Sequence, residues 1–87
     1  MRQPTEFEMA VYKTVKKIPK GETRSYAWVA EQAGRPKAVR AVGNALNRNP
    51  FAPEVPCHRV VRSDGTIGGF RYGAERKREI LKEEGAL

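Results

Sequence analysis

Glycine and proline divide this sequence into segments that leave room only for short helices. Thr5 and Glu8 have the spacing of a capping box, and apolar residues then recur at helical intervals as far as Ile18. The residues Pro19-Lys20-Gly21 end that pattern. We therefore expect a first helix that begins just after Thr5 and ends before the proline.

The next two segments are typical of a helix-turn-helix. Ser25 is a candidate N-cap for a helix over 26–33, and Gly34 ends it. Pro36 then stands where the first residue of a third helix would, and Asn49-Pro50 stops that helix. Its apolar face consists of Val39, Val42 and Leu46. Two helices of about two to three turns, joined by a short glycine-containing turn, form this motif.

The second half of the sequence predicts a hairpin and a last helix. Asp64-Gly65 favours a tight turn and lies between the apolar residues of 60–62 and 66–67. Residues 74–84 have helix-forming composition and end at Gly85. We therefore predict a mainly α, winged-helix-like domain with a helix-turn-helix and a small β-hairpin.

Length and composition exclude several classes of protein. The 87 residues allow one small domain, 1–87. No apolar run approaches the roughly 18 residues of a membrane span, and no signal peptide opens the sequence, so we expect a cytoplasmic (nucleoid-associated) or nuclear protein that is not secreted. One cysteine and one histidine cannot form an intramolecular disulfide or a zinc site, and we expect no metal and no cofactor.

The net charge of +7 is concentrated in the middle of the chain. Between Lys13 and Arg62 there are 11 basic and three acidic residues. Such a positive region favours an anionic polymer as partner, with nucleic acid first and an anionic membrane surface second. A basic surface that serves only solubility is the remaining alternative.

The third helical stretch is the candidate recognition helix, because the second helix of this motif enters a groove of DNA. Opposite its apolar face are Arg40, Gly43, Asn44 and Asn47. The small residues Ala41 and Gly43 would let the backbone approach DNA closely. Two simpler interpretations stay open: Gly43 serves helix packing, and Arg40 only attracts phosphate.

The Pro56-Cys57-His58-Arg59 sequence holds the chain's one thiol beside its one histidine. A lone cysteine is most often a small buried hydrophobe, and a lone histidine is most often structural. Nearby positive charge, however, favours the reactive thiolate. In an extended segment adjacent side chains point to opposite faces, so His58 would act as a base only through a turn or an intervening water. A thiolate suits attack on a saturated carbon, and the resulting thioether would block further reaction.

Taken together, the sequences Pro56-Cys57-His58-Arg59-Val60-Val61, Arg40-Ala41-Val42-Gly43 and Asn49-Pro50 resemble the 6-O-alkylguanine-DNA alkyltransferase family, the methylated-DNA–protein-cysteine methyltransferases. The similarity runs from about Phe7 to Gly85. It implies DNA repair by direct reversal. The alkyl group of 6-O-methylguanine in duplex DNA would pass irreversibly, in a single turnover, to a cysteine after base flipping.

The resemblance implies a role for each matching residue. Cys57 matches the alkyl acceptor, His58 the base that deprotonates it through a water, and Glu84 the glutamate that orients the histidine. Asn49 matches the asparagine that ties the helix-turn-helix to the active-site segment.

On the DNA side, Arg40 resembles the finger that replaces the flipped nucleotide. Tyr26 resembles the tyrosine that crowds the adjacent phosphate and hydrogen-bonds the extruded guanine. The expected DNA-binding set is completed by Ala41, Gly43 and Asn44. Phe70 stands where the family commonly has a tyrosine, and Arg71 and Tyr72 replace small residues at the pocket rim. The expected substrate pocket consists of Tyr26, Val60, Phe70 and Arg71.

An alternative function follows from the departures from the family pattern. The usual enzymes carry an additional N-terminal domain, which we expect this chain to lack. Short members include alkyltransferase-like proteins, which bind alkylated guanine without removing the alkyl group and have tryptophan where Cys57 stands. The alternative is therefore a lesion-binding protein that recruits a separate repair partner protein. In either case we expect a monomer on double-stranded DNA that contains 6-O-alkylguanine. A winged helix with no lesion preference would leave Asn49, Cys57, His58 and Glu84 unexplained.

Overall fold

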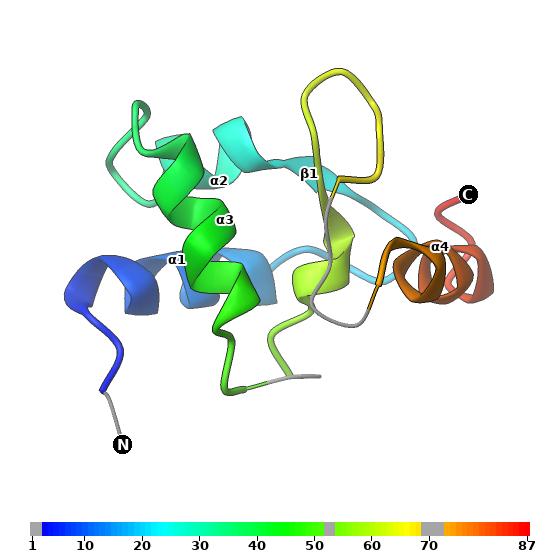
Figure 1. Cartoon of the computed structure of the whole chain (residues 1–87), viewed down its shortest axis with the longest axis horizontal. Helices are drawn as coiled ribbons and strands as arrows, with labels where there is room; N and C mark the ends of the chain where they lie inside the picture. The colour runs from blue at the N-terminus through cyan, green and yellow to red at the C-terminus, as the bar shows by residue number, and fades with distance from the viewer. Residues whose placement is uncertain (1–2, 52–53, 69–72) are drawn as a thin grey trace.

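The computed structural model describes residues 3–51, 54–68 and 73–87. Its elements, in chain order, are α1 (Glu6–Lys16), β1 (Arg24–Ser25), α2 (Tyr26–Gln32), α3 (Val39–Asn47), a 3-10 turn η1 (Cys57–Arg59), β2 (Val60–Val61) and α4 (Ala74–Glu83) (Figure 1). The fold is mainly α, as predicted. No helix within the described ranges is long and apolar enough to cross a membrane.

The first helix begins at the predicted capping box. Glu8 N donates to Thr5 Oγ1 at 3.1 Å, and Thr5 N donates to Glu8 Oε1 at 2.9 Å. Two of the orphan donors at this helix end are thereby satisfied. The helix buries Val11 and Val15 completely in the core.

The helix-turn-helix forms, with one boundary later than predicted. Ser25 Oγ accepts a hydrogen bond from Trp28 N at 3.0 Å and caps α2. The chain leaves α2 through Gly34, whose φ of 87° favours glycine. Pro36 does not begin α3, because residues 36 and 37 belong to a turn that Ala38 N closes onto Arg35 O at 2.9 Å.

The predicted apolar face of α3 is correspondingly shorter. Val42 and Leu46 are buried, but Val39 is 38% exposed at the start of the helix. On the inner side, Tyr12 Oη donates to Ala45 O at 2.7 Å and fastens α3 to α1.

The predicted hairpin was only half right. Its turn is present, with Gly65 N donating to Arg62 O and Arg62 N to Thr66 O, each at 3.0 Å. The described residues after the turn form no strand. Asp64 Oδ1 accepts from Thr66 N at 2.9 Å, and Gly68 follows with a φ of 78°, which is not an extended conformation. β2 instead pairs in parallel with β1, Arg24 opposite Val60 and Ser25 opposite Val61.

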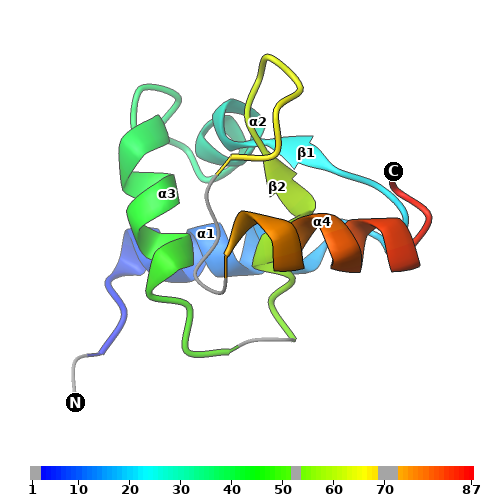
Figure 2. The same ribbon diagram turned by 45° about the vertical axis from the view of Figure 1, so that its right-hand side comes forward.

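The core lies between α1, α2 and α3 and reaches the segment that carries η1 and β2. Its buried members are Val11, Tyr12, Val15, Ile18, Val29, Ala30, Val42, Ala45, Leu46, Val55, Cys57 and Val60. α4 packs on η1 and crosses in front of the η1–β2 segment in Figure 2, and Figure 1 shows it on the side of the molecule opposite to α3. The cysteine segment therefore lies between the helix-turn-helix and the last helix.

Candidate functional site

Asn49 ties the end of α3 to the segment that leads to the cysteine. Its side chain is almost completely buried. Nδ2 donates to Val55 O at 2.9 Å, and Oδ1 accepts from Phe51 N at 2.9 Å. One amide thus holds both ends of the connecting loop and fixes where the chain enters η1.

Cys57 opens a tight turn, which is one of the two alternatives that the sequence left open for this segment. Arg59 N donates to Pro56 O at 2.9 Å, and Val60 N donates to Cys57 O. A 3-10 turn has about three residues per turn, so successive side chains project in different directions around one axis. His58 and Arg59 can therefore both reach α4. The Cys57 side chain is nearly buried, with 7% of the residue exposed.

His58 contacts the carboxylate of Glu84. Nε2 lies 3.0 Å from Oε1, and each side chain is 11% exposed. Since an ionised carboxylate only accepts hydrogen bonds, the hydrogen lies on Nε2 and the basic nitrogen of the neutral ring is Nδ1. The structure brings this predicted pair together.

Arg59 is the third member of this cluster. Nε donates to Glu84 Oε1 at 3.0 Å, and Nη2 donates to Oε2 at 2.7 Å. These hydrogen bonds, with a smaller contribution from His58, lower the pKa of Glu84 to about 2. They also raise the pKa of Arg59. The sequence had suggested Arg59 only as a positive neighbour of Cys57. We call His58, Arg59 and Glu84 the Glu84 cluster.

A hollow of about 540 Å³ opens on the exposed side of α3. It gathers four predicted residues, Tyr26, Arg40, Gly43 and Asn44, and it is also lined by Val39, Asn47 and Arg62. We call these seven residues the α3 hollow. Ala41 is exposed on the same helix but does not line it.

Asn47 was predicted on this side of the helix, whereas Val39 was assigned to the apolar face and Arg62 was not predicted in the site. The spacing of Val39, Gly43 and Asn47 at every fourth position would have placed them on one helical stripe. Arg62 carried no local signal, because it reaches the hollow only through the pairing of β2 with β1.

The remaining pocket residues are not gathered there. Val60 lies in β2 with its side chain completely buried in the core, so it has no side-chain surface in the hollow. Phe70 and Arg71, with Tyr72, lie outside the described residues.

Lys77 connects α4 to the tyrosine of the hollow and was missed in the sequence. It is completely buried, and Nζ donates to Ile67 O at 2.7 Å and lies 3.4 Å from Tyr26 Oη. Burial lowers the pKa of Lys77 to about 8. Burial also raises the pKa of Tyr26, and the charge of Arg62 opposes that rise. A lysine four residues before Leu81, on the apolar stripe of α4, was the available signal.

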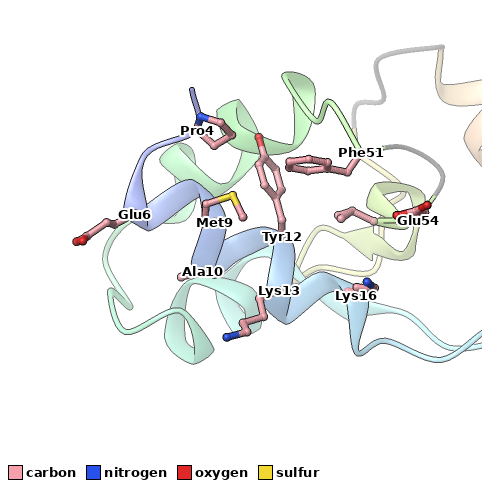
Figure 3. A pocket seen from close by; sticks show the side chains of 10 residues that line it. Pro4, Glu6, Met9, Ala10, Tyr12, Lys13, Lys16, Phe51 and Glu54 are labelled. Atoms are coloured by element: carbon pink, nitrogen blue, oxygen red, sulfur yellow. The ribbon is translucent and has the colours of Figure 1, made fainter. Parts of the chain in front are cut away.

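A second hollow, of about 640 Å³, lies on α1. Figure 3 shows Met9 and Tyr12 of α1 close to Phe51. The rings of Tyr12 and Phe51 meet edge to face, with centroids 5.6 Å apart. None of the predicted site residues is among the described residues that line this hollow.

Fold and site together define a DNA-binding domain of an alkyltransferase type, and comparison with known families agrees. Residues 6–86 match the family described as "6-O-methylguanine DNA methyltransferase, DNA binding domain". The chain belongs to this family, which confirms the predicted resemblance.

Individual relatives are similar over almost all of the chain. A methylated-DNA–protein-cysteine methyltransferase of Methanosarcina acetivorans is 50% identical over 94% of this chain and 53% of its own length. The bifunctional transcriptional activator/DNA repair enzyme Ada of Escherichia coli is 49% identical over 92% of this chain and 23% of its own length. The chain thus spans about half the length of the methyltransferase relative, and less of Ada.

Two solved structures are also similar. Mycobacterium tuberculosis OGT in complex with DNA has a TM-score of 0.92 and 46% identity, over 97% of this chain and 52% of that one. S. pombe Atl1, in complex with damaged DNA containing O6-carboxymethylguanine, has a TM-score of 0.83 and 38% identity. That match covers 98% of this chain and 80% of Atl1.

Proposed function

We propose that this chain binds duplex DNA through the α3 hollow, extrudes a 6-O-alkylguanine and transfers the alkyl group once to Cys57. The observation that carries the proposal is one short turn. η1 holds a nearly buried thiol next to a histidine whose Nε2 contacts Glu84 at 3.0 Å. A nucleophile, a base and a carboxylate that orients the base are the parts such a reaction requires.

The proposed transfer balances without a further reactant. The Cys57 thiol gives its proton to His58, directly or through one water, and the sulfur attacks the alkyl carbon. The S–C bond forms while the C–O bond breaks, and the bonding pair stays on the guanine oxygen. The guanine takes up one proton from water and leaves in its neutral form, and the charged His58 returns its proton to water, so that the thiol proton is the one gained overall. Ionised Glu84 stabilises the charged histidine. The thioether on Cys57 is not hydrolysed, so the protein reacts only once.

The exposed side of α3 supports binding to DNA. Gly43 leaves open space there, since a Cβ built on it would meet nothing within 4 Å. Arg40 and Arg62 bring positive charge to the rim of the α3 hollow. Extruding a base costs a few kcal/mol, less for a damaged pair, and contacts of this kind can offset that cost. The likeness to M. tuberculosis OGT, which was solved in complex with DNA, supports DNA as the partner.

Tyr26 is the residue that we propose to contact the extruded guanine. It lines the α3 hollow, and its ring lies beneath Lys77 Nζ at 5.6 Å from the ring centroid. The buried lysine, fixed on Ile67 O, would hold the tyrosine ring in place.

Intact-protein mass spectrometry tests the transfer. The chain is mixed with a duplex that carries 6-O-methylguanine, and the mass and the modified peptide are measured. We expect the gain of one methyl group on Cys57, stoichiometric with protein, and none in Cys57→Ala. A duplex with unmodified guanine is the matched control.

The second candidate is a lesion-binding protein that recruits a separate repair partner. The likeness to Atl1, which this chain covers over most of that protein's length, favours it. The same experiment separates the two candidates. Tight binding to the methylated duplex with no mass change would support lesion binding and contradict transfer.

A further inference from the structure

We infer that Arg59 is a positioning residue, which clamps the Glu84 carboxylate and so fixes which nitrogen of His58 carries the proton. This inference rests on the proposed transfer to Cys57. It concerns a residue that does not touch the alkyl group and acts through its neighbours.

Three donors of one guanidinium are used at once. Nε and Nη2 take the two oxygens of Glu84, and Nη1 donates to Ile18 O at 2.9 Å. The fork holds the carboxylate against rotation, and the third hydrogen bond anchors the fork to the chain just after α1. A lysine ammonium is a single point of charge and cannot make this planar, bidentate contact.

Glu84 needs such a partner because of its position in the fold. It is the C-cap residue of α4, where the helix dipole disfavours a negative charge. Its backbone is also closely packed. A Cβ at Gly21 would lie 3.2 Å from Glu84 O, and Gly21 has a φ of 90°, which favours glycine. The carboxylate is therefore held by α4, η1 and the segment between α1 and β1.

The clamp matters because Glu84 Oε1 accepts from two groups, Arg59 Nε and His58 Nε2. With Oε1 fixed, the hydrogen of the neutral imidazole stays on Nε2, and Nδ1 remains able to accept the Cys57 proton. Without Arg59 the carboxylate can turn away, and the ring then populates the tautomer with hydrogen on Nδ1. That tautomer cannot take a proton at Nδ1.

The chain contains one histidine, so the tautomer can be measured directly. Nitrogen-15 NMR of the ring is recorded over a series of pH values, and the tautomer is read from the spectra of the neutral ring. We expect one tautomer, with hydrogen on Nε2, in the unsubstituted chain and a mixture in Arg59→Met. Arg59→Lys keeps the charge but lacks the fork, and we expect a mixture there as well.

The single-turnover rate of methyl transfer is the second readout. We expect it to fall about 10-fold or more in Arg59→Met and less in Arg59→Lys, because general-base catalysis contributes about 10²–10⁴-fold. Affinity for the methylated duplex should stay within about 2-fold, since Arg59 is absent from the α3 hollow. Arg76→Met removes an equal charge from an exposed pair with Glu79 and should leave both readouts unchanged.

The outcomes are distinguishable. A folded Arg59→Met that keeps one tautomer and the full rate would overturn the inference. If Arg59→Met does not fold, Arg59→Lys decides, and a full rate with one tautomer there has the same consequence. If the unsubstituted chain transfers no methyl group, the proposed function fails, while the NMR comparison still tests the clamp.

Discussion

The Glu84 cluster and the α3 hollow differ in how their polar groups are satisfied. In the cluster, Arg59 and Glu84 bind each other through both carboxylate oxygens, and His58 completes the arrangement at 3.0 Å. In the hollow, the side chains of Arg40 and Asn44 have no hydrogen-bond partner among the residues that the structure describes. One region is complete before any ligand arrives, and the other presents groups that are free to bind one.

This difference has a physical cause. Buried polar groups must be paired within the protein because an unpaired one costs about 1–3 kcal/mol. Among the described residues no buried side-chain nitrogen or oxygen lacks a partner. Exposed groups are satisfied by water, which a DNA phosphate or base can replace. Substitutions in the Glu84 cluster should therefore impair alkyl transfer or folding, whereas substitutions in the α3 hollow should impair DNA binding.

The largest expected effect is that of Cys57→Ala. It should abolish transfer, because no other thiol is present in the chain, and leave affinity for the methylated duplex nearly unchanged. Mass spectrometry and a binding titration on the same duplex measure the two quantities. A loss of affinity as complete as the loss of transfer would break the separation between the two regions.

Asn49→Ala should have the largest effect on the stability of the fold. It leaves Val55 O and Phe51 N without the amide that now pairs them, and we expect a loss of about 2–4 kcal/mol. Urea unfolding gives the free energy. The matched control is Asn47→Ala, on the exposed side of α3, with an expected change within about 0.5 kcal/mol. Equal losses in the two variants would show that burial of the amide is irrelevant.

The burial of Lys77 makes the free energy of unfolding depend on pH. Its pKa is lowered from 10.5 to about 8, so the unfolded chain binds the proton more tightly than the folded one. The free energy of unfolding should therefore rise with pH, by about 2 kcal/mol from about pH 7 to 9.5. Lys77→Met should lack this rise, whereas Lys82→Met, exposed on the same helix, should keep it. A rise of the same size in Lys77→Met would assign it to other groups.

The sequence predicted those parts of the fold that neighbouring residues determine. Thr5 and Glu8 are three residues apart, and Ser25 caps Trp28 at the same spacing, so both helix starts could be predicted. The Asp64-Gly65 turn also formed. The pairing of β2 could not be predicted from that turn, because its partner lies in residues 24–25 and burial of Val60 decides the contact.

The candidate site also contains some residues that the sequence indicated and others whose roles only the structure shows. The resemblance named His58 and Glu84, and the structure brings them together across 26 residues. The roles of Arg59 and Lys77 depend on side chains that reach distant backbone oxygens, those of Ile18 and Ile67. Arg59 differs in no way from an ordinary surface cation in the sequence. The spacing of Lys77 from Leu81 places it on the apolar stripe of α4 but does not indicate which backbone oxygen it reaches.

Arg40→Ala should have the smallest effect of these substitutions, and it tests whether the α3 hollow binds DNA. Arg40 is exposed at the rim of the α3 hollow, so its removal should weaken DNA binding and reduce the dependence of log K on log salt by about one counterion. Stability should change by less than about 0.5 kcal/mol. Arg76→Ala, on the exposed side of α4, is the matched control and should leave the slope unchanged. An unaltered slope in Arg40→Ala would mean that Arg40 does not face the DNA, and the role of the α3 hollow would then have to be reassigned.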